Sequence, residues 1–175
     1  MELARALRAA EPRAGRTRVL AIDGRSGCGK TTLAAELSKD LGGAPVVSLE
    51  NLYGGWDGLE AGIDRLVTEV LEPLAAGRTA LVPSYDWIGA RWSEPVPLAP
   101  PELLIVEGVG AGARRAAAFV SVLVWLEVPD EERERRALAR DGDIYRPFWD
   151  RWAAQEEVML ARERPWERAT AFGGG

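Results

Sequence analysis

The stretch that decides the fold is Gly24-Arg25-Ser26-Gly27-Cys28-Gly29-Lys30-Thr31-Thr32. It follows an apolar run at 19–22 and leads into 33–37, where apolar residues recur at helical spacing. Its fixed positions fill the pattern G-x-x-x-x-G-K-[ST], a phosphate-binding loop that joins a buried strand to a helix. Glycines permit positive φ and leave room for backbone N–H groups to surround a polyphosphate. The pattern therefore predicts a nucleotide site in place of a plain strand-to-helix turn.

Each side chain of the loop has an expected task. Lys30 is expected to reach the β- and γ-phosphates, and Thr31 to place its hydroxyl on Mg²⁺. Cys28 is the only cysteine, and its place among small residues favours a structural role over a redox role. The residues expected to bind ATP are Gly24, Ser26, Gly27, Cys28, Gly29, Lys30, Thr31, Thr32 and, from a later helix, Arg140.

Composition narrows the class of protein. The 175 residues suit one domain, and the net charge of −5, with arginines scattered among acids, argues against a nucleic-acid surface. No apolar run approaches the length that a membrane requires and no secretory signal is evident, so we expect a cytoplasmic protein without membrane contact. Histidine is absent, so any proton acceptor in a reaction must be a carboxylate.

Apolar runs alternate with helical patterns along the whole chain. Strands are expected near 17–23, 45–49, 79–82, 103–106 and 120–126, and helices near 3–10, 30–41, 63–76, 130–140 and 144–162. Because each strand is apolar throughout, the pattern predicts an α/β fold: three layers, with a parallel sheet covered by helices on both faces.

The chain is expected to form a single domain over 1–175, with four distinct segments. Residues 1–16 form an accessory N-terminal segment, and the Pro-rich passage 83–101 is interpreted as an irregular binding loop. Residues 133–147 form a lid. The tail 169–175 shows little sign of order, so the sheet either lacks its final strand or takes it from another chain.

Two carboxylates stand where strands end. Glu107 closes the most apolar strand and is expected to face Thr31 across the metal, in the Walker B arrangement. Glu50 follows the second strand, together with Asn51 and Tyr53. In parallel sheets this edge is where ligands bind.

The arginines of the lid allow two interpretations. Arg133, Arg135, Arg136 and Arg140 recur at helical spacing, which is typical of a solvated face with i,i+4 partners such as Glu132. The glycine turn at 141–143 and the basic Arg146 that follows it favour a lid that closes on phosphate.

Taken together, these motifs resemble the uridine kinase and phosphoribulokinase group of P-loop kinases. The resemblance runs from about residue 17 to residue 168, and it rests on the phosphate loop, Ser48-Leu49-Glu50-Asn51-Leu52-Tyr53, Tyr85-Asp86-Trp87, Val106-Glu107-Gly108 and 136–141. It implies a nucleoside/nucleotide kinase-like P-loop NTPase fold. It also implies transfer of the γ-phosphoryl group of ATP, with Mg²⁺, to a hydroxyl of a nucleoside-like or other small acceptor.

The resemblance implies roles for residues outside the loop. Glu50 would accept the proton of the attacking hydroxyl, although the family more often has Asp there, and it could instead bind substrate or be a bystander. The implied catalytic residues are Lys30, Glu50, Arg136 and Arg140, and the implied acceptor contacts are Glu50, Tyr53, Asp57, Tyr85, Asp86, Trp92 and Arg146.

The sequence departs from the family in its acceptor region. Uridine kinases place a histidine five residues after the Tyr of the Tyr-Asp pair, and here that position is Ala90. Trp56, Trp87 and Trp92 lie in expected loops, where their rings would either stack on a flat acceptor or fill the loop.

Three functions therefore stand side by side. The first is a small-molecule kinase, with a homo-oligomer and a monomer as alternative assembly states. The second is a catalytically degenerate ATP-binding regulatory module of the same fold, and the third is an ATP hydrolase that needs no acceptor. A GTPase switch is disfavoured because the Asn-Lys-x-Asp guanine motif does not occur.

Overall fold

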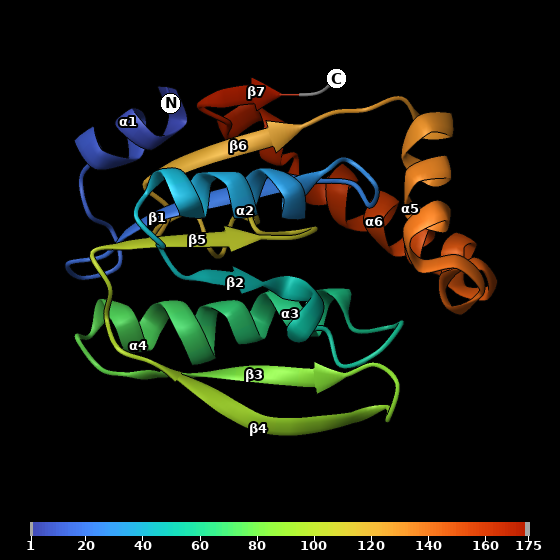
Figure 1. The fold of residues 1–175 in the computed structure, drawn as a ribbon, viewed down its shortest axis with the longest axis horizontal. Helices are drawn as coiled ribbons and strands as arrows, with labels where there is room; N and C mark the ends of the chain where they lie inside the picture. The colour runs from blue at the N-terminus through green and yellow to red at the C-terminus, as the bar shows by residue number, and fades with distance from the viewer. Residues whose placement is uncertain (1, 174–175) are drawn as a thin grey trace.

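The structure is a computed structural model that describes residues 2–173, apart from the side chains of Arg140, Asp141, Asp143 and Ile144. Its centre is a five-stranded, all-parallel sheet in the order β2-β5-β1-β6-β7 (Figure 1). The strands are β1 (Arg18–Gly24), β2 (Val46–Ser48), β5 (Leu103–Glu107), β6 (Val122–Leu126) and β7 (Ala171–Gly173). The predicted α/β fold with a parallel sheet is confirmed.

Both faces of the sheet are buried because successive residues of β1 enter different cores. Leu20 and Ile22 pack with α1 (Glu2–Ala9) and α2 (Lys30–Asp40) on one face. Val19 and Ala21 belong to the larger core on the other face. Burial on both faces is the reason that β1 is apolar at four successive positions, Val19–Ile22.

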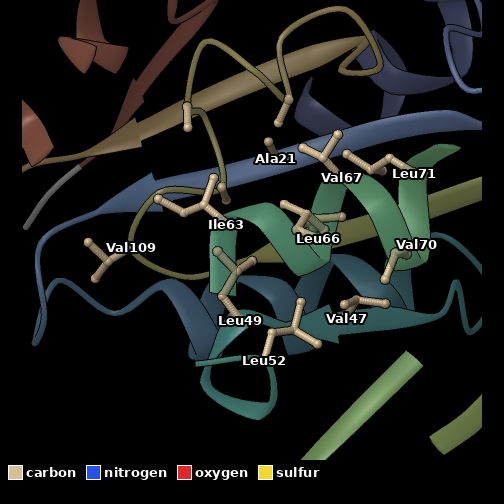
Figure 2. Packing of buried hydrophobic residues seen from close by; sticks show 14 of the residues in the cluster. Ala21, Val47, Leu49, Leu52, Ile63, Leu66, Val67, Val70, Leu71 and Val109 are labelled. Carbon is tan, nitrogen blue, oxygen red and sulfur yellow. The ribbon is translucent and has the colours of Figure 1, made fainter. Parts of the chain in front are cut away.

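The larger core is built on one long helical segment. It runs as α3 (Leu59–Arg65), a π-helical turn (Leu66–Leu71) and α4 (Glu72–Ala75). Pro73, which has no N–H to donate to a helical ladder, is the second residue after the π-helical turn. Figure 2 shows the apolar side chains of this segment gathered beside Ala21 of β1 and Val47 of β2. The predicted helix over 63–76 is present with this wider turn inside it.

The Pro-rich passage is a β-hairpin, so the prediction of an irregular loop over 83–101 is wrong. β3 (Ala80–Asp86) pairs antiparallel with β4 (Arg91–Leu98) in a separate two-stranded sheet. β4 tolerates Pro95 and Pro97 because within the described residues it has a partner strand on one side only. The hairpin lies beyond the α3–α4 segment, away from the central sheet (Figure 1).

The tail supplies the last strand of the sheet, which corrects the expectation of a missing or borrowed strand. β7 pairs in parallel with β6 through Val124↔Ala171 and Leu126↔Gly173. Thr170 reinforces the junction, because its backbone N–H donates to the Leu123 carbonyl oxygen at 2.8 Å and its hydroxyl bonds the same residue. Residues 174 and 175 of the predicted tail lie outside the described part of the chain.

The predicted lid, residues 133–147, is one interrupted helix and part of the short turn that follows it. α5 (Asp130–Tyr145) is interrupted at Gly142, whose φ of 55° and ψ of −132° are not helical. A 3-10 turn (Arg146–Phe148) then leads into α6 (Trp149–Glu163), which a second 3-10 turn (Pro165–Arg168) connects to β7. The predicted glycine break is present, while the last long helix begins at 149 and not at 144. Within residues 2–173, none of the helices combines the length and the apolar character needed to cross a bilayer.

Two leucines are expected to differ clearly in how much they contribute to the free energy of unfolding. Leu66 is fully buried under the sheet, whereas Leu81 on the hairpin is 56% exposed. We expect Leu66→Ala to lower the free energy of unfolding by about 2–5 kcal/mol. Leu81→Ala, the matched control, should change it by less than about 0.5 kcal/mol in the same urea titration. Equal losses in the two variants would contradict this assignment of the core.

Candidate active site

The carboxyl ends of β1, β2 and β5 meet at one edge of the sheet, and a cavity of about 720 Å³ opens there. The phosphate loop lines one side of it through Ser26, Gly27, Gly29, Lys30, Thr31 and Thr32. The other lining residues are Glu50, Tyr53, Trp56, Trp87, Gly108, Val109, Arg136, Ala137, Tyr145 and Trp152. Nucleotide-loop residues and Glu50, predicted separately, therefore share one cavity.

Glycine is required in the phosphate loop by close contact as well as by conformation. Gly24, Gly27 and Gly29 have φ values of 152°, 84° and 89°. A Cβ atom on Gly27 would lie 2.0 Å from the carbonyl oxygen of Arg133. The first turn of α5 therefore rests directly on the loop, which only a residue without a side chain permits.

The Lys30 side chain folds back and contacts the backbone of the phosphate loop. Its side chain is buried, and Nζ donates a hydrogen bond to the Arg25 carbonyl oxygen at 2.9 Å. The ammonium group thus stands inside the loop that it is expected to serve. Of the other predicted ATP contacts, Gly24 and Cys28 do not line the cavity, and Cys28 packs into the core beside α2.

The structure brings together Thr31 and Glu107, the two residues predicted to bind Mg²⁺. The Thr31 hydroxyl donates to Glu107 Oε2 at 3.3 Å. Glu107 is 2% exposed, and its second oxygen, Oε1, accepts no hydrogen bond from the described residues. A hydroxyl beside a buried carboxylate with an unused oxygen fits Mg²⁺, which is held by few protein groups and completes its shell with water and phosphate. The described residues contain no cluster of three or more Cys, Asp and Glu that would suit a fully protein-bound ion.

Glu50 and Tyr53 follow β2 at the same edge. Glu50 lies in a 3-10 turn (Leu49–Asn51), where its carbonyl oxygen accepts a hydrogen bond from Trp87 Nε1 at 3.0 Å. Tyr53 is buried and donates its hydroxyl to the Val109 carbonyl oxygen at 3.0 Å. Burial raises the pKa of Tyr53 well above its usual value, so the phenol stays protonated. Tyr53 therefore holds the segment that follows Glu107.

Aromatic rings from three segments meet around Trp56. Its ring centroid lies 4.7 Å from that of Trp87 on the hairpin loop, and it stacks on Tyr145 and Phe148 of the lid segment at 5.2 and 4.7 Å. Trp56 and Trp87 both line the cavity and both pack on neighbouring rings, so they fill their loops, and stacking on an acceptor stays a prediction. Tyr145 and Trp152 also line the cavity. Neither was predicted to belong to the site, because aromatic residues in a helical segment are typical of a buried core face.

Several predicted acceptor residues make other contacts. Asp86 lies in the hairpin turn, where Oδ1 accepts from the N–H groups of Ile88 and Gly89, both at 3.0 Å. These bonds, the one from Gly89 first, lower the pKa of its carboxyl. Tyr85 packs edge-on against Trp87 and Trp92, at 5.4 and 5.1 Å. Neither Asp86 nor Tyr85 nor Trp92 lines the cavity.

Two further predicted acceptor residues lie next in sequence to residues that line the cavity. Asp57 forms an exposed, two-bonded ion pair with Arg151 of α6. Arg146 is exposed in the 3-10 turn between α5 and α6. Both stand on segments that carry lining residues, and neither lines the cavity itself.

The arginines of α5 divide between the two interpretations. Arg135 is exposed and pairs with Glu132, as a solvated face would. Arg136 also donates to Glu132, at 2.7 Å, but it lines the cavity beside the phosphate loop. Arg133 is buried against the loop. The side chain of Arg140, a predicted catalytic and ATP-binding residue, lies outside the described part of the structure.

A glycine-rich loop at the end of the central strand, with an acidic residue closing the adjacent strand, defines the P-loop nucleotide-binding class. A family model described as an AAA domain matches residues 20–148. A uridine kinase of Staphylococcus haemolyticus is 30% identical over 142 residues, which are 71% of this chain and 69% of that protein. A uridine kinase of Borrelia duttonii is 25% identical over 138 residues, 71% of this chain and 67% of that protein.

The fold also agrees with a solved structure. A "possible uridine kinase" from Bacillus stearothermophilus superposes with a TM-score of 0.71 and 23% identity, over 98% of this chain and 95% of that chain. The chain belongs to the uridine kinase-like family of P-loop kinases, in the AAA-domain group that the family model describes.

The burial of Cys28 makes a prediction about its reactivity. Burial raises the pKa of the thiol above its usual value, so the reactive thiolate is scarce at neutral pH. We expect iodoacetamide to alkylate the folded chain at pH 8 at least about tenfold more slowly than the chain unfolded in urea, which serves as the control because Cys28 is the only cysteine. The folded-state rate should rise as the pH approaches the raised pKa. Equal rates in the two states would show an exposed thiol of ordinary acidity.

Proposed function

We propose that the protein is a kinase that transfers the γ-phosphoryl group of ATP to a hydroxyl of a nucleoside-like or other small acceptor. The observation that carries this proposal is the single cavity that holds Lys30, Thr31 and Glu50, with Glu107 behind Thr31. Uridine kinase relatives support the phosphotransferase class, and the acceptor is part of the proposal.

The reaction needs positions and charges more than covalent chemistry. The acceptor oxygen attacks the γ-phosphorus, the bond from that phosphorus to the bridging oxygen breaks, and ADP leaves with the electron pair. The hydroxyl proton passes to the Glu50 carboxylate, which is the proposed base. Lys30 would exchange the Arg25 carbonyl oxygen for phosphate oxygens, and Arg136 would add positive charge from the lid. Bound Mg²⁺, held by Thr31 and Glu107, would neutralise charge on the phosphates.

The far side of the cavity suits an acceptor with a flat, apolar surface. Tyr53, Trp56, Trp87, Tyr145 and Trp152 line it. Aromatic rings favour ring-shaped ligands through stacking and burial. This supports a nucleoside-like acceptor, although the recognition would differ from that of histidine-bearing uridine kinases because the chain contains no histidine.

The proposal predicts a severe effect at Lys30. Lys30→Ala removes the only ammonium group of the loop, and we expect kcat/KM for ATP to fall about a thousandfold or more. Lys39→Ala is the matched control, because Lys39 is the only other lysine and lies exposed in the last turn of α2. ADP release would be followed over a panel of nucleosides, sugars, vitamins and amino-sugar alcohols. Activity that survives in Lys30→Ala would refute the assignment of the phosphate loop.

A second prediction concerns Glu50. Glu50→Gln keeps the shape of the side chain but removes its ability to take a proton, so we expect kcat to fall about 10²- to 10⁴-fold while the Kd of ATP stays nearly unchanged. Glu94→Gln, on the exposed face of β4, controls for loss of a negative charge. Equal turnover in Glu50→Gln and the parent chain would remove Glu50 from the role of base. ATP binding without acceptor-stimulated ADP release in the parent chain would favour the regulatory module, and acceptor-independent release the hydrolase.

A further inference from the structure

A completely buried carboxylate lies behind the phosphate loop. Glu156 of α6 is 0% exposed. Its Oε1 atom accepts from the backbone N–H of Ser26 at 2.9 Å, from the Ser26 hydroxyl at 2.5 Å and from Trp152 Nε1 at 2.9 Å. Three donors on one oxygen, two of them from the phosphate loop, show that this side chain is built into the loop.

The other oxygen of Glu156 faces two arginines. Arg25 Nε donates to Oε2 at 3.4 Å, and Arg133 Nη1 lies 3.7 Å from the same atom. Arg25 belongs to the phosphate loop, and Arg133 to the first turn of α5. A buried carboxylate is tolerated only where charge and hydrogen bonds compensate it, and this one has both.

These contacts occupy both donors of Ser26. Its N–H and its hydroxyl proton point to Glu156, and its hydroxyl oxygen also lies 3.0 Å from Trp152 Nε1. Ser26 was predicted to bind ATP directly. In this arrangement it also fixes the path of the loop immediately before Gly27, the residue on which α5 rests.

We propose that Glu156 is a positioning residue that fixes the phosphate loop, the lid and the acceptor wall relative to one another. The acceptor wall is the set of aromatic residues that line the far side of the cavity: Tyr53, Trp56, Trp87, Tyr145 and Trp152. It acts on the loop through Ser26, on the lid through Arg133 and on the wall through Trp152, whose ring lies 4.7 Å from that of Tyr53. The inference rests on the proposed function, since it assigns the carboxylate to the binding of MgATP by that site. Glu156 itself does not line the cavity, so it acts through these neighbours.

The test compares two adjacent glutamates. Glu156→Gln removes the buried charge with little change of shape, and Glu157→Gln removes the next one. Glu157 is the matched control, because its side chain is 72% exposed and also pairs with Arg25, at 3.6 Å, without touching Ser26. We expect Glu156→Gln to raise the Kd of MgATP, measured by calorimetric titration, about tenfold, which is the weight of one charged hydrogen bond. Glu157→Gln should change it less than about twofold.

A double-variant cycle separates positioning from stability. Ser26→Ala keeps Glu156 in place and removes one of its donors, so it should weaken MgATP binding in the parent chain and add little in the Glu156→Gln background. A merely structural role would lower Tm in Glu156→Gln while leaving the Kd of the folded protein unchanged. Should Glu156→Gln fail to fold, Ser26→Ala alone decides the question, because an unchanged Kd there overturns the proposal.

The outcomes also distinguish this inference from the proposed function. A parent chain that does not bind MgATP overturns both. Binding by the parent chain with an unchanged Kd in Glu156→Gln overturns the positioning role alone. Tighter binding in Glu156→Gln overturns it as well, since the carboxylate would then compete with phosphate for the Ser26 donors.

Discussion

The carboxylate of Asp23 holds the two loops of the site together. It is fully buried at the end of β1, where it accepts hydrogen bonds from the N–H groups of Gly24, Gly110 and Gly112 at 2.7, 2.9 and 2.8 Å. Gly24 opens the phosphate loop, and the two other glycines follow Glu107. Burial raises the pKa of Asp23 and the three N–H groups oppose that rise. One side chain therefore sets how far the phosphate loop stands from the acidic strand end, and the hydrogen bond between Thr31 and Glu107, the proposed metal ligands, depends on that spacing.

The central layers could be predicted from the sequence because their signals are local. An apolar strand followed by a glycine loop and a helix is complete within residues 18–40, and this unit forms as expected. The hairpin was missed because Pro95 and Pro97 are poor strand residues, and only the one-sided pairing of β4 makes them acceptable. β7 was missed because a three-residue strand has no periodicity of its own. Its existence depends on the edge that β6 offers.

The site follows the same division. The phosphate side comes from one continuous stretch, so Lys30 and Thr31 could be placed from their spacing, and Glu107 from the strand that it ends. Glu156 could not be placed in the site from the sequence, because a glutamate in a helix rich in charged residues is ordinarily exposed to solvent. Its burial arises from α6 crossing behind the loop, a tertiary arrangement without a local signal. Asp86 is the opposite case, a residue predicted to belong to the site that has a local structural role. Its carboxylate accepts hydrogen bonds from backbone N–H groups in the turn of the hairpin.

The acceptor side and the lid are joined by Trp56. Because its ring stacks on Tyr145 and Phe148 and also contacts Trp87, the loop after β2, the lid segment and the hairpin form one aromatic wall. The helix that rests on the phosphate loop at Gly27 also carries Tyr145, which stacks on Trp56. The lid therefore cannot move away from the phosphate loop without separating rings of that wall. In the proposed kinase, closing the predicted lid over the phosphates would therefore also enclose the acceptor. Such coupling would exclude water when the γ-phosphoryl group is exposed to attack.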